Sequence, residues 1–424
     1  KILAYKKIII HQTNMNKNSF TLITLITLLL ISCNTGFNKT KQCNITPLNG
    51  TDTYWAEYLG HDQTMDFWPD KFVNYWMVVV NKNDFPNIGF KIQGEFPKAR
   101  YFSYNVYGED RNSTASLFDT QIKAENCSAN PFKNQEKETS VDKNLYTLFV
   151  VPESVSEFDK NDNVLKFIDG EEEISLVLRY YVPFEGDRAG VGLPKIEVFD
   201  LDSKESVTIP KTNSSLMVTP QILGRINAQY SLQIDNNVRF YRGDPTGLYP
   251  NNDNQYVRTF LNYDNDDVYI IRWKVPTFPK NSSEFDSVEV RYSSMNLGDN
   301  ITNNFDGIYD TQYKLDKDGF VTLVIADEIP EIREKAETAG YNFMPWTIPG
   351  NRGYLIYRNL LPKKGINAAY ILNGVPLPSF ETNQSHVITH DAKNYIGAYA
   401  PTGLRMTKDK YLTDFGGFNH KLQE

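Results

Sequence analysis

The sequence predicts a mainly β protein: two tandem antiparallel β-sandwich (jelly-roll-like) modules related by internal duplication, with few short helices. Two observations support this prediction. The 424-residue chain contains 26 Tyr and 25 Phe, and aromatic residues favour strands over helices. In addition, a set of short motifs recurs in the same order in both halves of the chain, which is typical of a repeated structural unit.

Composition and charge narrow the classes of function. A chain of this length is expected to form about two or three domains, and its 23% charged and 40% hydrophobic residues fit a globular protein. The net charge of −8 argues against a nucleic-acid partner, because such a partner requires a basic face. Three Cys and five His leave little material for a metal site, and we predict neither a metal nor a cofactor.

The N-terminal residues predict export. Residues 1–14 contain no Met, so we infer Met15 as the start. The apolar run over residues 19–31 is shorter than the roughly 20 residues of a membrane-spanning helix and is typical of a secretory signal, so residues 1–32 should be removed. The run ends Leu30-Ile31-Ser32-Cys33, which resembles the bacterial lipoprotein signal and implies a lipidated Cys33. The alternative is an ordinary signal peptide with a chance Cys.

The segment 33–69 should then be a lipidated tether and N-terminal segment. Residues 1–32 hold four Lys and no acidic residue, so their removal would leave a net charge of −12. Anionic headgroups would repel that chain, so the lipid must hold the protein to its membrane. We expect an exported, membrane-anchored bacterial lipoprotein, on the outer membrane or on a periplasmic or surface face. Cys43 and Cys127 would remain for one disulfide; the alternative is two buried free thiols.

The repeat defines the modules, at residues 70–200 and 255–365. Arg100-Tyr101-Phe102-Ser103-Tyr104-Asn105 recurs as Arg291-Tyr292-Ser293-Ser294-Met295-Asn296, and nineteen residues after each Arg stands an Asp, Asp119 or Asp310. Near the end of each copy an apolar strand carries Arg179 or Arg358, sixteen residues after Asn163 or Asn342. Two equal spacings and one order of motifs are hard to obtain by chance.

The remaining segments connect or close the modules. Residues 201–254 form a connector with a short helix near residues 220–228, and residues 366–424 form a tail that packs on the modules and ends in a helix at 407–412. The second module alone should carry a helix from Ile329 to Tyr341, with Pro330 in its first turn and Gly340 near its end.

Strand periodicity divides the repeated motif into two faces. Phe102, Tyr104 and Val106 share the apolar face, which should point into the core. The opposite polar face is identical in the two copies, with Tyr101, Ser103 and Asn105 matching Tyr292, Ser294 and Asn296.

Two explanations of this polar face stay open. It forms a structural network, with Arg100 and Arg291 paired to Asp119 and Asp310, or it lines twin pockets or one pocket between the modules. Arg179 and Arg358 likewise serve as strand-end ion pairs or recognise a carboxylate or phosphate. The candidate ligand-binding residues are Arg100, Tyr101, Ser103, Asn105, Asp119, Arg179, Arg291, Tyr292, Ser294, Asn296, Asp310 and Arg358.

Signals for catalysis are weak. The chain has no Gly-x-Ser-x-Gly elbow, no Walker loop and no His-Glu-x-x-His motif. The one local group of His and Asp is His386, His390 and Asp391, in a tail segment that reads as a loop. These three residues are weak catalytic candidates.

The order of motifs resembles that of uncharacterised exported bacterial proteins, frequent in actinobacteria, that carry the Arg-Tyr-x-Ser strand twice. They also end with a Gly-x-Tyr-x-Pro-x-Gly element, here residues 397–403. Each module more distantly resembles the β-sandwich domain of unknown function numbered 1214. The resemblance implies the fold and brings no established activity.

The function predicted is that of a lipid-anchored cell-envelope protein. It would bind a small molecule, glycan or protein partner through an aromatic-rich face or the groove between the modules. The alternatives are an exported hydrolase with a site not recognisable from sequence and a structural envelope protein.

Overall fold

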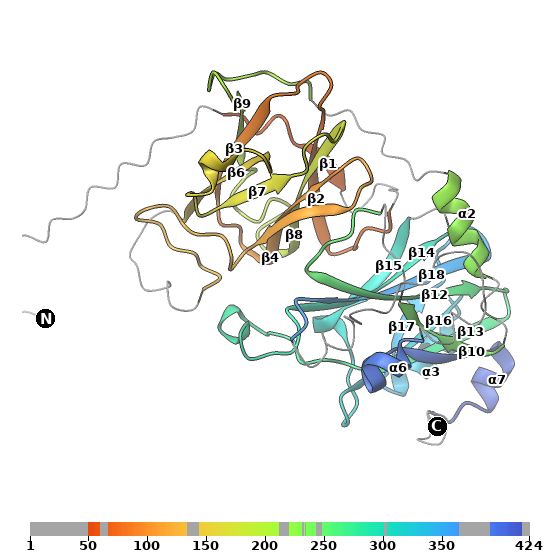
Figure 1. Cartoon of the computed structure of the whole chain (residues 1–424). Helices are drawn as coiled ribbons and strands as arrows, with labels where there is room; N and C mark the ends of the chain where they lie inside the picture. The colour runs from red at the N-terminus through yellow and green to blue at the C-terminus, as the bar shows by residue number, and fades with distance from the viewer. Residues whose placement is uncertain are drawn as a thin grey trace, which may run out of the picture. The chain divides into compact units, whose positions relative to one another are not determined.

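The computed structural model describes residues 50–59, 67–133, 144–211, 220–230, 233, 235–242, 248–300, 303–363 and 391–417. The protein is mainly β, as the sequence predicts, and the strands of the described residues form four sheets; Figure 1 shows their arrangement. All four sheets belong to one compact unit, Pro47–Glu424. Among the residues described, no helix is long and apolar enough to cross a membrane.

The first half of the chain forms two sheets. One has the strand order β1-β2-β8-β4-β5 and the other the order β7-β6-β3-β9. The strands are β1 (Ala56–Leu59), β2 (Val73–Asn81), β3 (Ile88–Glu95), β4 (Ala99–Tyr107), β5 (Ser113–Phe118), β6 (Leu145–Pro152), β7 (Val164–Phe167), β8 (Glu173–Pro183) and β9 (Lys195–Asp200).

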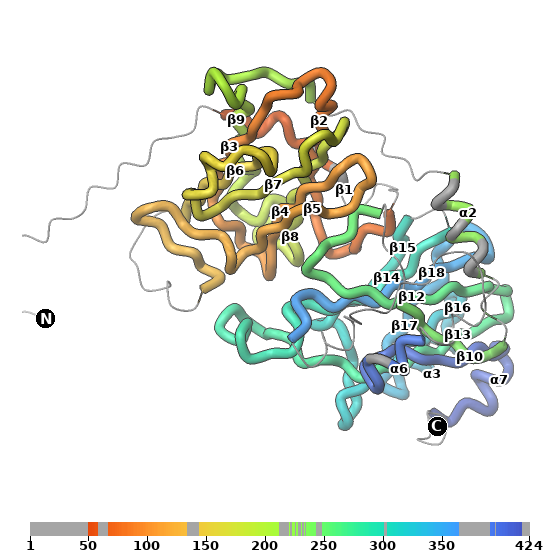
Figure 2. Tube along the Cα trace, viewed as in Figure 1, coloured from red at the N-terminus to blue at the C-terminus, as the bar shows by residue number. Residues whose placement is uncertain are grey.

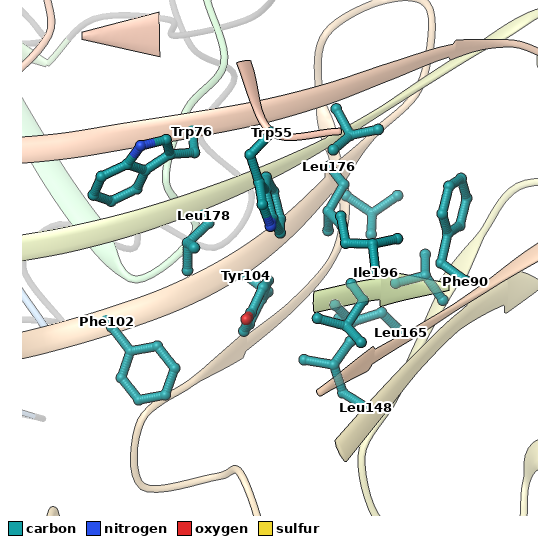
Figure 3. Packing of buried hydrophobic residues seen from close by; sticks show 14 of the residues in the cluster. Trp55, Trp76, Phe90, Phe102, Tyr104, Leu148, Leu165, Leu176, Leu178 and Ile196 are labelled. Atoms are coloured by element: carbon teal, nitrogen blue, oxygen red, sulfur yellow. The ribbon is translucent and has the colours of Figure 1, made fainter. Parts of the chain in front are cut away.

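The core of this half lies between its two sheets. Trp76, Leu178 and Phe102 come from β2, β8 and β4, and they face Leu148 and Ile196 from β6 and β9 (Figure 3). Phe102, Tyr104 and Val106 all belong to this cluster, so the apolar face of the repeated motif points into the core as predicted.

The second half also forms two sheets. Their strand orders are β11-β12-β18-β14-β15 and β10-β19-β13-β16-β17. The strands are β10 (Asn237–Arg239), β11 (Tyr241–Arg242), β12 (Asn254–Asn262), β13 (Asp267–Lys274), β14 (Tyr292–Asp299), β15 (Asn304–Tyr309), β16 (Phe320–Ala326), β17 (Asn342–Pro345), β18 (Arg352–Leu360) and β19 (Thr402–Thr407). Met295, Leu323 and Tyr357 lie in its core.

Eight strands of each half correspond in order. The order β2-β8-β4-β5 matches β12-β18-β14-β15, and β7-β6-β3-β9 matches β17-β16-β13-β19. Among the described strands, each half has one parallel pair, β6 with β7 and β16 with β17. The register also agrees, because Ser103 and Ser294 stand opposite Arg179 and Arg358. Figure 2 follows this chain path from the red strands to the blue C-terminal segment.

Helices connect and cover the strands. They are α2 (Pro220–Gln229), α3 (Pro330–Thr338), α6 (Lys393–Ile396) and α7 (Lys408–Thr413). The connector helix, the helix of the second module and the closing helix therefore all form near their predicted positions. Helix α3 begins with Pro330 at its first turn, and it buries Ile332 and Ala336 against Val324 and Tyr411.

The second module extends beyond residue 365, where the sequence predicted it to end. Strand β19 comes from the predicted tail and pairs with both β13 and β10. Strands β10 and β11 come from the predicted connector and join the same two sheets. The tail therefore completes a sheet, because β13 would otherwise present an unpaired edge.

Candidate functional site

The face opposite each core is also buried, because the two halves pack against each other. One apolar cluster contains Tyr75, Met77 and Tyr101 from the first half together with Tyr292 and Leu360 from the second. Tyr101, Ser103 and Asn105 thus face away from their own core, but they are fully buried. The predicted polar face is an interface between the modules.

The two repeated Arg–Asp pairs cross this interface. The sequence suggested pairs within each copy, Arg100 with Asp119 and Arg291 with Asp310, and that pairing is wrong. Arg100 pairs with Asp310, and Arg291 Nη1 lies 3.0 Å from Asp119 Oδ2. Because the faces that carry these residues pack against each other, each carboxylate lies within reach of the guanidinium of the other half. Burial raises the pKa of Asp119 to about 6, against the opposing effect of Arg291.

The matched tyrosines also bond across the interface. Tyr101 donates to Asp253 Oδ2 at 2.5 Å, and Tyr292 donates to Asp70 Oδ1 at 2.8 Å. Burial raises the pKa of Asp253, although the Tyr101 hydroxyl opposes this shift. Ser294 Oγ donates to Asp70 Oδ2 at 2.6 Å. These contacts agree with the structural explanation of the polar face, not with twin pockets.

Two irregular segments, here called the arms, lead into the first strand of each sheet at the interface. They are residues 67–70, which precede β2, and residues 248–251, which precede β12. Trp68 and Tyr249 hold equivalent places and both adopt left-handed backbone, with φ of 46° and 50°. A tyrosine of the following strand holds the last residue of each arm. Asp70 N donates to Tyr75 Oη, and Asn251 N donates to Tyr256 Oη, both at 3.0 Å.

Each arm accepts a hydrogen bond from the arginine of the other half. Arg179 Nη2 donates to the Tyr249 carbonyl at 3.0 Å, and Arg358 Nη2 donates to the Trp68 carbonyl. Trp68 also stacks on Tyr354 of β18, with ring centroids 4.1 Å apart, and its Nε1 donates to the Asp299 carbonyl. Each arm therefore packs against, and hydrogen-bonds to, the module of the other half.

A cavity lies between the arms and strands β2, β8, β12 and β18. The space inside it that admits water-sized molecules is about 80 Å³, within an empty volume of about 780 Å³ that includes open solvent at its mouth. The enclosed space alone is therefore below the usual size of a small-molecule site. Its wall is largely aromatic, with Phe67, Trp68, Tyr75, Tyr181, Tyr249, Tyr256 and Tyr354. The charged groups among its described lining residues are Arg179, Arg258 and Arg358, with no Asp or Glu.

The cavity brings together two of the twelve predicted ligand-binding residues, Arg179 and Arg358. Both are nearly fully buried. Burial opposes the charge of Arg358, but Asp70 and neighbouring tyrosines outweigh it, so its pKa lies above the ordinary value and the side chain is a permanent cation. The other ten predicted residues belong to the ion pairs and hydrogen bonds of the interface.

Several predicted residues lie outside the part of the chain that the structure describes. These are Cys33, Cys43, His386 and His390. Asp391 is described, and it forms a backbone bridge with Tyr241 while its carboxylate accepts from Lys393 N. Cys127 is half-buried. Within the described ranges, no group of three His, Cys, Asp or Glu could hold a metal ion.

Sequence reasoning missed the arms, which supply much of the cavity wall. The sequence does contain a pattern that could have revealed them. Trp68-Pro69-Asp70 and Tyr249-Pro250-Asn251 each consist of an aromatic residue, a Pro and a short polar residue. Both lie upstream of the repeat as it was delimited, in segments without strand periodicity.

Comparisons with known proteins assign neither a family nor an activity to the chain. No protein-family model matches the chain, and no curated protein matches it. The solved structures that are similar include an uncharacterised protein from Burkholderia cenocepacia, with a TM-score of 0.48 and 10% identity, covering 85% of this chain and 84% of the other. They also include the VPA0106 protein from Vibrio parahaemolyticus, with a TM-score of 0.39 and 11% identity, covering 70% and 86%.

Proposed function

We propose that this protein binds a small molecule in the cavity between its modules. The observation that carries the proposal is the cavity itself, which is walled by aromatic residues from both halves and by three buried arginines. Concave, mostly apolar sites with a few fixed polar groups are typical of small-molecule binding. The glycan and protein alternatives need an open aromatic platform, whereas the aromatic rings here lie in a recess.

A cavity-filling variant tests the proposal. The neutral dye N-phenyl-1-naphthylamine is titrated against the wild-type protein, Ile356→Trp in the cavity wall, and Leu315→Trp as the control. Leu315 is 47% exposed and lies outside the cavity. We expect Ile356→Trp to lower the affinity for the dye at least tenfold and Leu315→Trp to leave it unchanged.

Overpacking a buried site can destabilise a protein, so Val177→Phe provides a second, smaller obstruction in the opposite wall. Equal dye affinity in the wild type and in folded cavity variants would contradict the proposal. Native mass spectrometry of the protein as purified would show directly whether a ligand is retained.

We also propose that the two halves are copies of one ancestral module. The repeated motifs, the correspondence of eight strands in each half and the equivalent arms support this proposal. The cavity would then be built from equivalent residues of the two copies, such as Tyr75 and Tyr256, which both line it.

The proposed setting of this binding site is the bacterial cell envelope, with a lipid on Cys33 as the anchor. Replacement of Cys33 by Ala should leave the protein unlipidated and release it from the membrane fraction, because no basic surface would hold an acidic chain there. Fractionation with metabolic lipid labelling measures both effects. Continued membrane retention of Cys33→Ala with an uncleaved N-terminus would exclude the lipoprotein signal.

A further inference from the structure

Two of the three arginines in the cavity wall, Arg179 and Arg358, occupy equivalent positions but have different surroundings. Both terminal nitrogens of Arg179 are hydrogen-bonded: Nη1 donates to Asn105 Oδ1 at 2.6 Å, and Nη2 donates to Tyr107 Oη at 2.8 Å and to the Tyr249 carbonyl at 3.0 Å. All its acceptors on side chains come from β4 of its own half. Arg179 is therefore a structural residue.

Arg358 lacks both of those side-chain acceptors. The position of Tyr107 is taken by Gly298, which has no side chain. The counterpart of Asn105 is Asn296, but its Oδ1 accepts a hydrogen bond from Lys71 N at 2.9 Å instead. As a result, Arg358 Nη1 is buried with no hydrogen-bond partner among the described residues.

The carboxylate of Asp70 lies close to Arg358 but does not accept a hydrogen bond from it. Arg358 Nε lies 3.9 Å from Asp70 Oδ2, too far for a hydrogen bond. The Asp70 carboxylate already accepts from the Tyr292 and Ser294 hydroxyls and from Phe72 N. A buried guanidinium N–H without an acceptor is costly, so this donor requires a partner from outside the chain.

The cavity wall indicates the chemistry of that partner. Its described lining contains three arginines and no carboxylate, and flat aromatic rings make up much of the remainder. A guanidinium matches the geometry of a carboxylate or sulfonate, and an anionic acceptor forms a stronger hydrogen bond with it than a neutral acceptor does. Aromatic walls favour a flat apolar body beside that anion.

We propose that the ligand of the cavity is an aromatic or similarly flat organic anion whose acidic group pairs with Arg358. This inference rests on the proposed function and names the class of ligand. Arg358 acts as the recognition residue and Arg179 as the matched structural arginine. A water molecule or an inorganic anion at Nη1 are the competing occupants that the test must separate.

Two dyes of similar body and different charge test the inference on the full chain. 8-Anilinonaphthalene-1-sulfonate carries an anionic group, and N-phenyl-1-naphthylamine does not. Arg358→Met removes the charge and keeps an apolar side chain, while Arg188→Met at an exposed turn is the control. We expect Arg358→Met to weaken binding of the sulfonate dye by about 10- to 100-fold, with the neutral dye changed less than about twofold and Arg188→Met without effect.

The outcomes separate this inference from the proposed function. Failure of both dyes to bind the wild-type protein would refute the proposed function and the inference with it. Binding of both dyes with equal loss, or with no loss, in Arg358→Met would overturn the inference alone.

A competition on the wild-type protein covers the case in which Arg358→Met does not fold. We expect 2-naphthoate to displace the neutral dye at a concentration at least tenfold below that of 2-naphthalenemethanol, and inorganic phosphate not to displace it. Equal displacement by the acid and the alcohol would show that water suffices at Nη1. Displacement by phosphate would show that a small inorganic anion is the occupant.

Discussion

Asp119 shows how burial and an ion pair compete at a single residue. Its carboxylate is fully buried and lies 3.0 Å from Arg291, yet burial dominates and raises its pKa from 3.8 to about 6. The folded state therefore binds the proton more tightly than the unfolded state. The contribution of this group to stability is fully present below pH 3.8 and is lost as the pH rises through about 6.

We predict that this loss is measurable. A shift of two pKa units corresponds to about 3 kcal/mol, so the wild-type protein should lose up to that amount relative to Asp119→Asn between pH 4 and pH 6.5. Urea unfolding of both proteins across this range measures the difference, and Asp202→Asn at an exposed turn is the control. A difference that grows in favour of the wild type as the pH rises would show that the ion pair dominates instead.

At the scale of elements, the arms connect the modules through few but specific contacts. Trp68 stacks on Tyr354, donates from its indole to the Asp299 carbonyl, and accepts from Arg358 through its own carbonyl. All three partners belong to the second half. The arm therefore contributes to the stability of the interface and also to the shape of the cavity.

Trp68→Ala should destabilise the protein by about 3–5 kcal/mol, the cost typical of removing a buried large aromatic side chain. Denaturant unfolding measures the change. Phe184→Ala is the control, because Phe184 is 52% exposed and should cost less than about 0.5 kcal/mol. A small effect of Trp68→Ala would mean that the arm does not clasp the second module in solution.

Local patterns in the sequence predicted where helices and strands form. They did not predict which strands pair or which side chains meet across the interface. The alternation of Phe102, Tyr104 and Val106 was sufficient to place that face in the core, and Pro330 with Gly340 was sufficient to delimit α3. In contrast, the partner of Arg100 depends on which faces of the modules meet, and no local periodicity encodes that choice. Strand β19 was missed for a related reason, since it pairs with strands more than a hundred residues earlier.

At the scale of the whole molecule, the crossed ion pairs make the modules depend on each other. A double-mutant cycle with Arg100→Met and Asp310→Asn should give a coupling energy of about 1–3 kcal/mol, because the pair is in contact and buried. The same cycle with Arg100→Met and Asp119→Asn should give a smaller value. Larger coupling between Arg100 and Asp119 would indicate pairing within the first module.

The proposed disulfide would tie the N-terminal segment to the first module. Non-reducing peptide mapping of exported protein should recover Cys43 joined to Cys127, which closes a loop of more than eighty residues. In the loop-closure account such a bond stabilises the fold by roughly 3–5 kcal/mol at most, so Cys43→Ser should lower the unfolding free energy by up to that amount. Two free thiols in exported protein would exclude the bond.

Because each half contacts the other through its arm and its ion-pairing residues, an isolated half would leave this contact surface exposed. Each half presents to the other the same kind of surface, with an arm, an Arg and an Asp that find their partners across the contact. Such a surface is self-complementary in the isologous sense that builds twofold homodimers. A single half would therefore expose a broad aromatic face with two unpaired charges, and its most direct means of covering that face would be a second copy of itself. The covalent link between the halves replaces that encounter, and it also allows the two sites to differ, as Tyr107 and Gly298 do.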